Sequence, residues 1–261
     1  MSDGARQLLE IAERAALAAG EELLRRFREP HEGLHAKSTP TDLVSEADLA
    51  AERLITALLV AERPGDALLA EEGGGELAHP GGDRLRWIVD PLDGTTNFLF
   101  GIGHWCVSIA CEDAAGTVAG VVHDPLRRET FAAARAAPPT LNGEPIVGSG
   151  ATELSTALVA TGFAYDAAVR ERQAVVVARL LPLVRDVRRF GSAALDLAWT
   201  AAGRYDAYFE RALRPWDERA GALLCARAGL EVIALEQRPG LPWGLLAAPP
   251  ALAGELRSLV D

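Results

Sequence analysis

The chain has 261 residues, of which 49% are hydrophobic and 24% charged, a balance typical of a globular protein and not of a disordered one. Lysine and arginine total 26 against 37 aspartates and glutamates, and the resulting net charge of −11 argues against non-specific nucleic-acid binding. The first apolar stretch carries acidic residues, unlike a signal peptide, and no apolar run reaches membrane-spanning length. We therefore expect a cytoplasmic protein with no nucleic-acid partner and no membrane partner.

The first part of the chain is expected to form two helices and then a sheet. Apolar residues recur at helical spacing over 4–28 and again over 45–62. A short strand-like run, DALLAEE, is followed by a glycine-rich loop and then by the buried strand Trp87–Val89. Short apolar runs separated by turns come next, with Asn142-Gly143 as a hairpin signal, and these predict an antiparallel sheet.

The second part alternates between strand and helix patterns, which predicts a mixed sheet covered by helices. In chain order the expected elements are a strand over 156–161, a helix over 166–182, a strand over 186–190, a helix over 192–202, a strand over 204–210, a helix over 217–228, a strand over 231–235, and a last strand and helix. We accordingly divide the chain into an α+β half, 1–145, and an α/β half, 146–261.

The cysteines do not indicate a disulfide framework or a zinc site. Cys106, Cys111 and Cys225 are too few and too irregularly spaced for either. We expect them to be reduced packing residues.

The stretch WIVDPLDGTTNF brings a buried strand to two aspartates, Asp90 and Asp93, three positions apart. Carboxylates and a backbone carbonyl are oxygen ligands that suit magnesium or manganese better than zinc. The following Gly94 and Thr95 could open a helix whose free N–H groups would bind phosphate oxygens. A plain turn, which Asp, Pro, Gly and Asn all favour, is the structural alternative.

Other carboxylates also stand at the ends of apolar runs, and each has a structural alternative. Glu71 and Glu72 end the run DALLAEE and could simply form a solvated edge. Asp217, in RPWDERAG, could be an N-cap that interacts with the helix dipole. Asp48 follows Ser45 with the spacing of a capping box. Taken singly, these residues leave both interpretations open.

Together, these segments resemble the inositol monophosphatase family of magnesium-dependent, lithium-sensitive phosphomonoesterases, and the resemblance covers nearly the whole chain. WIVDPLDGTTNF is similar to the family's first signature and RPWDERAG to its second. KSTPTDLVSEAD, AEEG, LNGEPI, TGFAYD and RRFGSAALDLAWTAAGRYDAYFE occur in the expected order and spacing. The resemblance implies an α/β fold, α+β by some schemes, built as a layered αβαβα sandwich.

The resemblance implies a site for two or three Mg²⁺ ions, with Mn²⁺ as a possible substitute. Glu71, Asp90 and the carbonyl of Leu92 would hold the first ion, and Asp90, Asp93 and Asp217 the second. A third, weaker ion would lie near Glu71. The half 1–145 would thus supply most of the metal ligands, and the half 146–261 would contribute Asp217.

The catalytic residues implied by the resemblance are Asp48, Glu71 and Thr95, with Thr95, backed by Asp48, orienting a metal-activated water. Lys37 would lie in the loop that the family closes over the metals. Glu210 would bind a substrate hydroxyl. The residues implied at the substrate are Asp93, Gly94, Thr95, Gly191, Ser192, Ala193, Glu210 and Asp217.

The implied function is hydrolysis of a small phosphate monoester, with myo-inositol 1-phosphate as the first choice. Histidinol phosphate, another sugar phosphate or a nucleotide phosphate is the alternative within the same chemistry. A non-catalytic binding protein is an alternative of another class, disfavoured because Asp90, Asp93 and Asp217 are all present. The resemblance also implies a homodimer. His104, close after the first signature, is expected to be a hydrogen-bonded turn residue and not a metal ligand.

Overall fold

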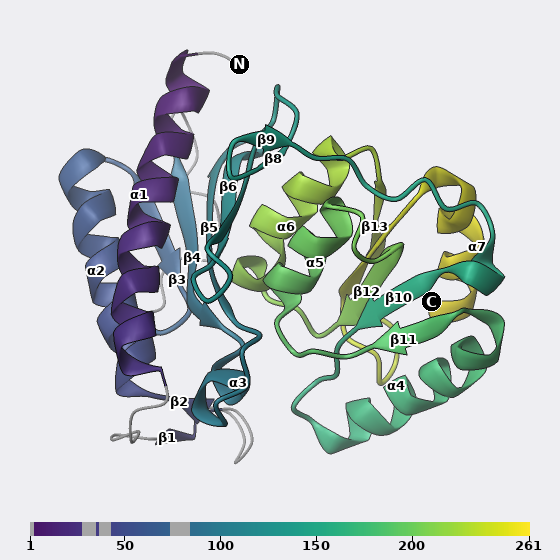
Figure 1. Cartoon of the computed structure of the whole chain (residues 1–261). Helices are drawn as coiled ribbons and strands as arrows, with labels where there is room; N and C mark the ends of the chain where they lie inside the picture. Colours follow the sequence, from purple (N-terminus) through teal and green to yellow (C-terminus); the bar gives the residue numbers. More distant parts are fainter. Residues whose placement is uncertain (1–2, 28–34, 37–42, 74–83) are drawn as a thin grey trace.

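Helices and sheets alternate in five layers in this computed structural model, which describes residues 3–27, 35–36, 43–73 and 84–261 (Figure 1). One apolar core lies between the first helices and the larger sheet, a second lies between the two sheets, and a third lies beneath the last helix. The helices of the three helical layers are, in order, α1 (Asp3–Arg26) with α2 (Glu46–Glu62), α5 (Ala193–Ala201) with α6 (Pro215–Arg227), and α4 (Ala167–Leu180) with α7 (Pro250–Val260). This arrangement confirms the expected αβαβα sandwich.

The larger sheet has seven strands in the order β3-β4-β5-β6-β7-β8-β9, and all neighbours except β3 and β4 run antiparallel. Asn142 (φ 51°) and Gly143 (φ 85°) form the predicted hairpin turn between its last two strands. The strands are β3 (Ala67–Ala70), β4 (Arg86–Asp93), β5 (Cys106–Asp113), β6 (Gly116–Asp124), β7 (Glu129–Ala134), β8 (Thr140–Leu141) and β9 (Glu144–Pro145). A short helix, α3 (Thr95–Leu99), follows β4, and β1 (His35–Ala36) pairs with β2 (Leu43–Val44).

The smaller sheet is mixed, as expected, with the order β11-β10-β12-β14-β13. Strand β10 runs parallel to β11 and β12, whereas β14 runs antiparallel to both of its neighbours. The strands are β10 (Leu158–Thr161), β11 (Asp186–Arg188), β12 (Ala207–Arg211), β13 (Glu231–Leu235) and β14 (Gly244–Ala248).

Several predicted element boundaries were wrong, among them the starts of α6, β10 and β12. Helix α6 begins at Pro215, two residues before the predicted start, because a proline loses no hydrogen bond in the first turn of a helix. Strand β10 begins at Leu158 because a 3₁₀ turn, Leu154–Thr156, occupies the start of the predicted strand. The earlier start of α6 makes Asp217 the third residue of the helix and not its N-cap.

The sequence suggested that strand β4 ends at Asp90. In the structure the strand continues to Asp93. Its register against β5 shifts between these residues, since Asp90 pairs with Ser108 and Asp93 pairs with Cys106. In a regular strand, residues three apart point to opposite faces. The extra residue on β4 therefore returns Asp93 to the face of Asp90, which is the face that packs toward α5 and α6.

The three cysteines are buried and unpaired, which confirms that they are reduced packing residues. Among the helices that the structure describes, none combines the length and apolar character needed to cross a bilayer.

Candidate active site

Four carboxylates from three separate parts of the fold lie within electrostatic range of one another: Glu71 after β3, Asp90 and Asp93 on β4, and Asp217 on α6. Burial, followed by the charges of the other three, raises the pKa of Asp90 well above its ordinary value. Burial, with Asp93 and Glu71 next, does the same to the pKa of Asp217. The fold thus concentrates negative charge in a place where water does not screen it.

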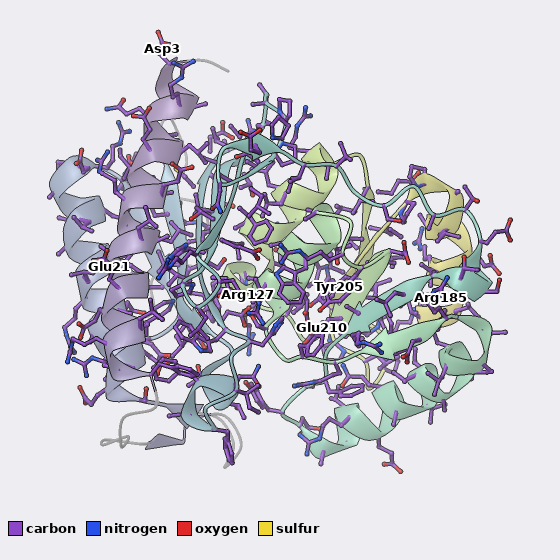
Figure 2. All side chains as sticks on the ribbon, viewed as in Figure 1. Asp3, Glu21, Arg127, Arg185, Tyr205 and Glu210 are labelled. Carbon is purple, nitrogen blue, oxygen red and sulfur yellow. The ribbon has the colours of Figure 1, made fainter. Side chains whose placement is uncertain are left out.

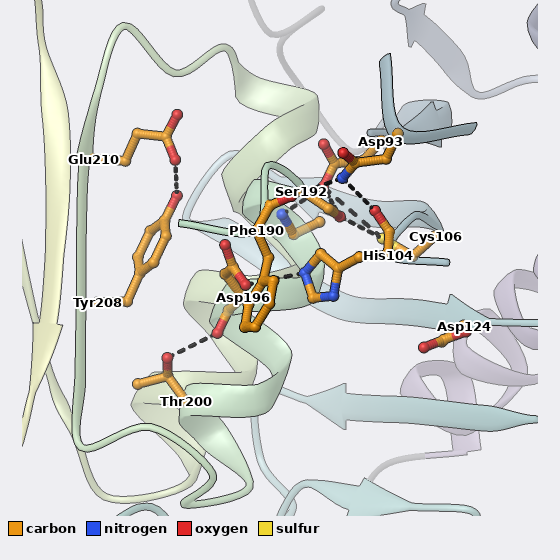
Figure 3. A network of polar contacts seen from close by, with 12 residues as sticks. Asp93, His104, Cys106, Asp124, Phe190, Ser192, Asp196, Thr200, Tyr208 and Glu210 are labelled. Atoms are coloured by element: carbon orange, nitrogen blue, oxygen red, sulfur yellow. Dashed lines mark hydrogen bonds and ion pairs between the residues drawn. The ribbon is translucent and has the colours of Figure 1, made fainter. Parts of the chain in front are cut away.

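Asp93 joins the larger sheet to the central helical layer (Figure 3). Its Oδ2 accepts hydrogen bonds of 2.7 Å from the Ser192 hydroxyl and 2.7 Å from the Ala194 N–H, at the start of α5. Burial raises the pKa of Asp93 to about 6, although these two hydrogen bonds oppose the rise. Ser192, the N-cap residue of α5, therefore uses its side chain on Asp93 and makes no cap hydrogen bond.

Asp90 and Asp217 are likewise anchored through one oxygen to a nearby backbone N–H. Oδ1 of Asp90 accepts from Leu92 N at 3.0 Å, and Oδ2 of Asp217 accepts from Arg214 N at 2.6 Å. The hydrogen bond to Arg214 caps the first turn of α6. Asp217 therefore stabilises its helix, which is the structural role that the sequence left open beside metal binding.

Thr95 and Asp48 are in direct contact. Thr95 Oγ1 lies 2.9 Å from Asp48 Oδ1 and 3.1 Å from the carbonyl oxygen of Leu92, and its single proton can serve one of them at a time. The other oxygen of Asp48 accepts from the Ser45 N–H at 2.9 Å and from its hydroxyl at 2.5 Å. Asp48 therefore forms the capping box of α2 and binds Thr95 as well, so the two interpretations of this residue do not exclude each other.

Gly94 occupies a position that only glycine fits without strain. Its φ is 96°, and an added Cβ would lie 2.9 Å from the carbonyl oxygen of His104. The backbone can therefore turn sharply between Asp93 and the N-terminus of α3.

Apart from Asp217 on α6, the predicted substrate residues of the second half lie on two adjoining elements. Gly191, with φ of 91°, leads into Ser192 and Ala193 at the start of α5. Glu210 lies on β12, well inside the outline of the molecule in Figure 2, and its Oε2 accepts a 2.7 Å hydrogen bond from the Tyr208 hydroxyl. Burial raises the pKa of Glu210 to about 7, against the effect of Tyr208 and Arg189.

Comparison with known proteins agrees with this geometry. The model of the inositol monophosphatase family matches residues 5–260. The chain belongs to the inositol monophosphatase family. Members of this family are phosphoric monoester hydrolases, and this chain is an enzyme of that class.

Relatives and solved structures of this family match most of the chain. The inositol-1-monophosphatase SuhB of Mycobacterium tuberculosis is 45% identical over 230 residues, covering 85% of this chain and 79% of that protein. The Nus factor SuhB of Escherichia coli is 41% identical over 223 residues, covering 85% and 83%. The crystal structure of the extragenic suppressor protein SuhB from Bartonella henselae superposes with a TM-score of 0.88 at 34% identity, covering 98% of each chain.

The donor set of this inositol monophosphatase family member is suited to a hard divalent cation. Among the residues that the structure describes, no group of three or more His, Cys, Asp or Glu side chains is spaced closely enough to hold a metal ion. Asp90 nevertheless hydrogen-bonds to Glu71, a contact that two carboxyl groups make only when one of them carries a proton. A cluster of oxygen ligands that must take up positive charge fits a magnesium-type ion.

Two polar contacts at this site were not predicted from the sequence. Asn97 Nδ2 donates to the carbonyl oxygens of His104 and Phe190, at 2.7 Å each, and so ties the segment after β4 to the segment before α5. Tyr208 lies two residues before Glu210, and the period of two along a strand could have placed them on the same face. His104 Nε2 lies 3.0 Å from Asp196 Oδ1, which confirms that His104 is hydrogen-bonded. Lys37 lies outside the described residues.

Proposed function

We propose that this chain hydrolyses a small phosphate monoester, with myo-inositol 1-phosphate as the first candidate substrate. The observation that carries the proposal is the charge-coupled cluster of Glu71, Asp90, Asp93 and Asp217, which the fold assembles from three segments. The name of the Mycobacterium tuberculosis relative, 45% identical over most of the chain, supports the substrate. In this proposal the half 1–145 supplies three of the four acids, and the half 146–261 supplies Asp217 and the substrate contacts.

The residues that would hold the cations are Glu71, Asp90, the carbonyl of Leu92, Asp93 and Asp217, and we propose two or three Mg²⁺ ions, with Mn²⁺ as a substitute. When bound, such ions lower the pKa of water and stabilise negative charge on the phosphate oxygens. Three of these carboxylates are anchored to backbone N–H groups, so they would hold the cations in defined positions.

Thr95 and Asp48 would orient the attacking water. When Asp48 Oδ1 accepts the hydroxyl hydrogen of Thr95, a lone pair of Oγ1 is left to accept a proton from water. Asp48 is buried, and burial raises its pKa. Its hydrogen bonds with Ser45 and Thr95 oppose this rise and favour the ionised carboxylate, which is the form that accepts the hydroxyl hydrogen of Thr95. Removing the Thr95 hydroxyl would leave the water without this partner.

The substrate would lie between the segment after β4 and the start of α5. The backbone N–H groups of Gly94 and Thr95 would bind phosphate oxygens, and Asp93 and Asp217 would border the phosphate. The Glu210 carboxylate would accept a hydrogen bond from a substrate hydroxyl, beside the backbone of Gly191, Ser192 and Ala193. The new bond joins a water oxygen to phosphorus, and the bond to the alcohol oxygen breaks, so the products are an alcohol and inorganic phosphate.

Phosphate release from a panel of esters tests the proposal. The panel contains myo-inositol 1-phosphate, histidinol phosphate, fructose 1,6-bisphosphate and adenosine 3′,5′-bisphosphate, at a fixed Mg²⁺ concentration. The variant Asp90→Asn should lose turnover of every ester, whereas Asp113→Asn, which weakens a surface ion pair with Arg135, should keep it. Release of no phosphate from any ester by the unmodified protein would refute the proposal.

A further inference from the structure

The turn that follows β3 carries Glu71, whose carboxyl group belongs to the acidic cluster. Pairing between β3 and β4 ends at Ala70 and Val89, and the Glu71 N–H makes one more hydrogen bond, of 3.1 Å, to the carbonyl oxygen of Val89. The next N–H, that of Glu72, lies beyond this ladder. A backbone N–H that a sheet no longer satisfies needs another acceptor when it is withdrawn from water.

A side chain of α2 supplies that acceptor. Glu52 is only 9% exposed, and its Oε2 accepts a 2.8 Å hydrogen bond from the Glu72 N–H. Its other oxygen lies against Gly73, where an added Cβ would come within 2.6 Å of Oε1. A hydrogen bond from a backbone N–H to a carboxylate is stronger than one between neutral groups. Glu52 therefore anchors the turn after β3 to α2.

The two backbone hydrogen bonds fix the direction of the Glu71 side chain. The Glu71 nitrogen belongs to the peptide group before its Cα, and the Glu72 nitrogen belongs to the peptide group after it. Since each peptide group is planar, holding both of them leaves little freedom in φ and ψ of Glu71. The carboxyl group is thereby directed toward Asp90, with which it shares a hydrogen bond.

Helix α2 makes a second contact with the site one turn earlier. Asp48 precedes Glu52 by four residues, so the two carboxylates lie on the same side of the helix, and Asp48 binds Thr95. We infer that Glu52 is a positioning residue for Glu71, so that one helix sets both the threonine that orients the water and the ligand of the first ion. The inference rests on the proposed function, since it takes Glu71 as a metal ligand.

Calorimetric titration with Mg²⁺, without substrate, tests the inference. Glu52→Ala removes the acceptor of the Glu72 N–H and should weaken Mg²⁺ binding at Glu71 about tenfold, as loss of a group that orients a metal ligand commonly does. Glu52→Gln keeps a side-chain oxygen for this N–H and should stay within about twofold of the unmodified chain. Glu62→Ala, which removes an exposed carboxylate of the same helix paired with Arg14, is the control and should leave the affinity unchanged.

Two further variants separate positioning from a general loss of stability. Gly73→Ala moves the Glu52 carboxylate without removing it, and should weaken the same site even if Glu52→Ala does not fold. When Glu71→Ala is already present, Glu52→Ala should cause no further loss of Mg²⁺ affinity, because the carboxylate that it positions is gone.

Three results would overturn the inference. They are full Mg²⁺ affinity in Glu52→Ala or in Gly73→Ala, an equal loss in Glu52→Gln and Glu52→Ala, and an undiminished effect of Glu52→Ala in the absence of the Glu71 carboxylate. Failure of the unmodified protein to bind Mg²⁺, or to release phosphate from any ester of the panel, would instead refute the proposed function.

Discussion

Ionisation of Glu210 should lower the stability of the fold as pH rises. Burial raises the pKa of this carboxyl from 4.5 to about 7, so the native state keeps a proton that the unfolded chain has already lost. The stability that this group contributes is fully present below its pKa in the unfolded chain, and it is lost as the pH rises through its pKa in the folded protein. At 1.36 kcal/mol per pKa unit the difference amounts to about 3 kcal/mol, of which roughly 2.5 is lost between about pH 5 and about pH 8.

Glu210→Gln should remove this loss, because glutamine keeps an oxygen for the Tyr208 hydroxyl and does not ionise. The assay is urea unfolding of both proteins at about pH 5 and about pH 8, with a chelator present so that cations make no contribution. Between the lower and the higher pH, the free energy of unfolding of the variant should rise by about 2 to 3 kcal/mol relative to that of the unmodified chain. Glu144→Gln, at an exposed position of β9, is the control and should show no such gain. Equal pH dependence in Glu210→Gln and the unmodified chain would refute the argument from burial.

Two other outcomes follow from the site. Mg²⁺ at a hundred times its Kd should stabilise the fold by about 2.7 kcal/mol, seen in scanning fluorimetry as a Tm several degrees higher, and Asp90→Asn should abolish the rise. An unchanged Tm of the unmodified chain would count against a cation at the acidic cluster. Gly162→Ala should raise KM for myo-inositol 1-phosphate about tenfold by displacing Glu210, and should leave the Mg²⁺-dependent rise in Tm intact. A normal KM would show that Glu210 does not meet the substrate.

Most helices and strands were predictable because each follows a simple local pattern, whereas the order of the five layers was expected only from the resemblance to the family. Helical periodicity placed α2, and β13 was predicted at its observed bounds. The path of β4 beyond Asp90 was not predictable in this way. Its extra residue is defined only by the register against β5, and that register depends on contacts between strands and not on the local sequence.

The roles of single carboxylates could not be settled from the sequence either. Asp48 fits a capping box and also fits a partner of Thr95, and the structure shows both contacts because a carboxylate has two oxygens. A local pattern can show only the contact to the nearby backbone. The contact across 47 residues becomes visible once the fold brings α2 and α3 together.

The anchoring of the aspartates has a consequence for the choice of ion. Asp90, Asp93 and Asp217 each commit one oxygen to a backbone N–H, so each is left with a single unanchored oxygen to offer. A calcium ion favours six to eight ligands and often takes both oxygens of one carboxylate, whereas magnesium requires a compact octahedron of singly bound oxygens. If these aspartates hold the cation proposed above, the number of oxygens that they present would therefore favour magnesium over calcium, without any difference in total charge.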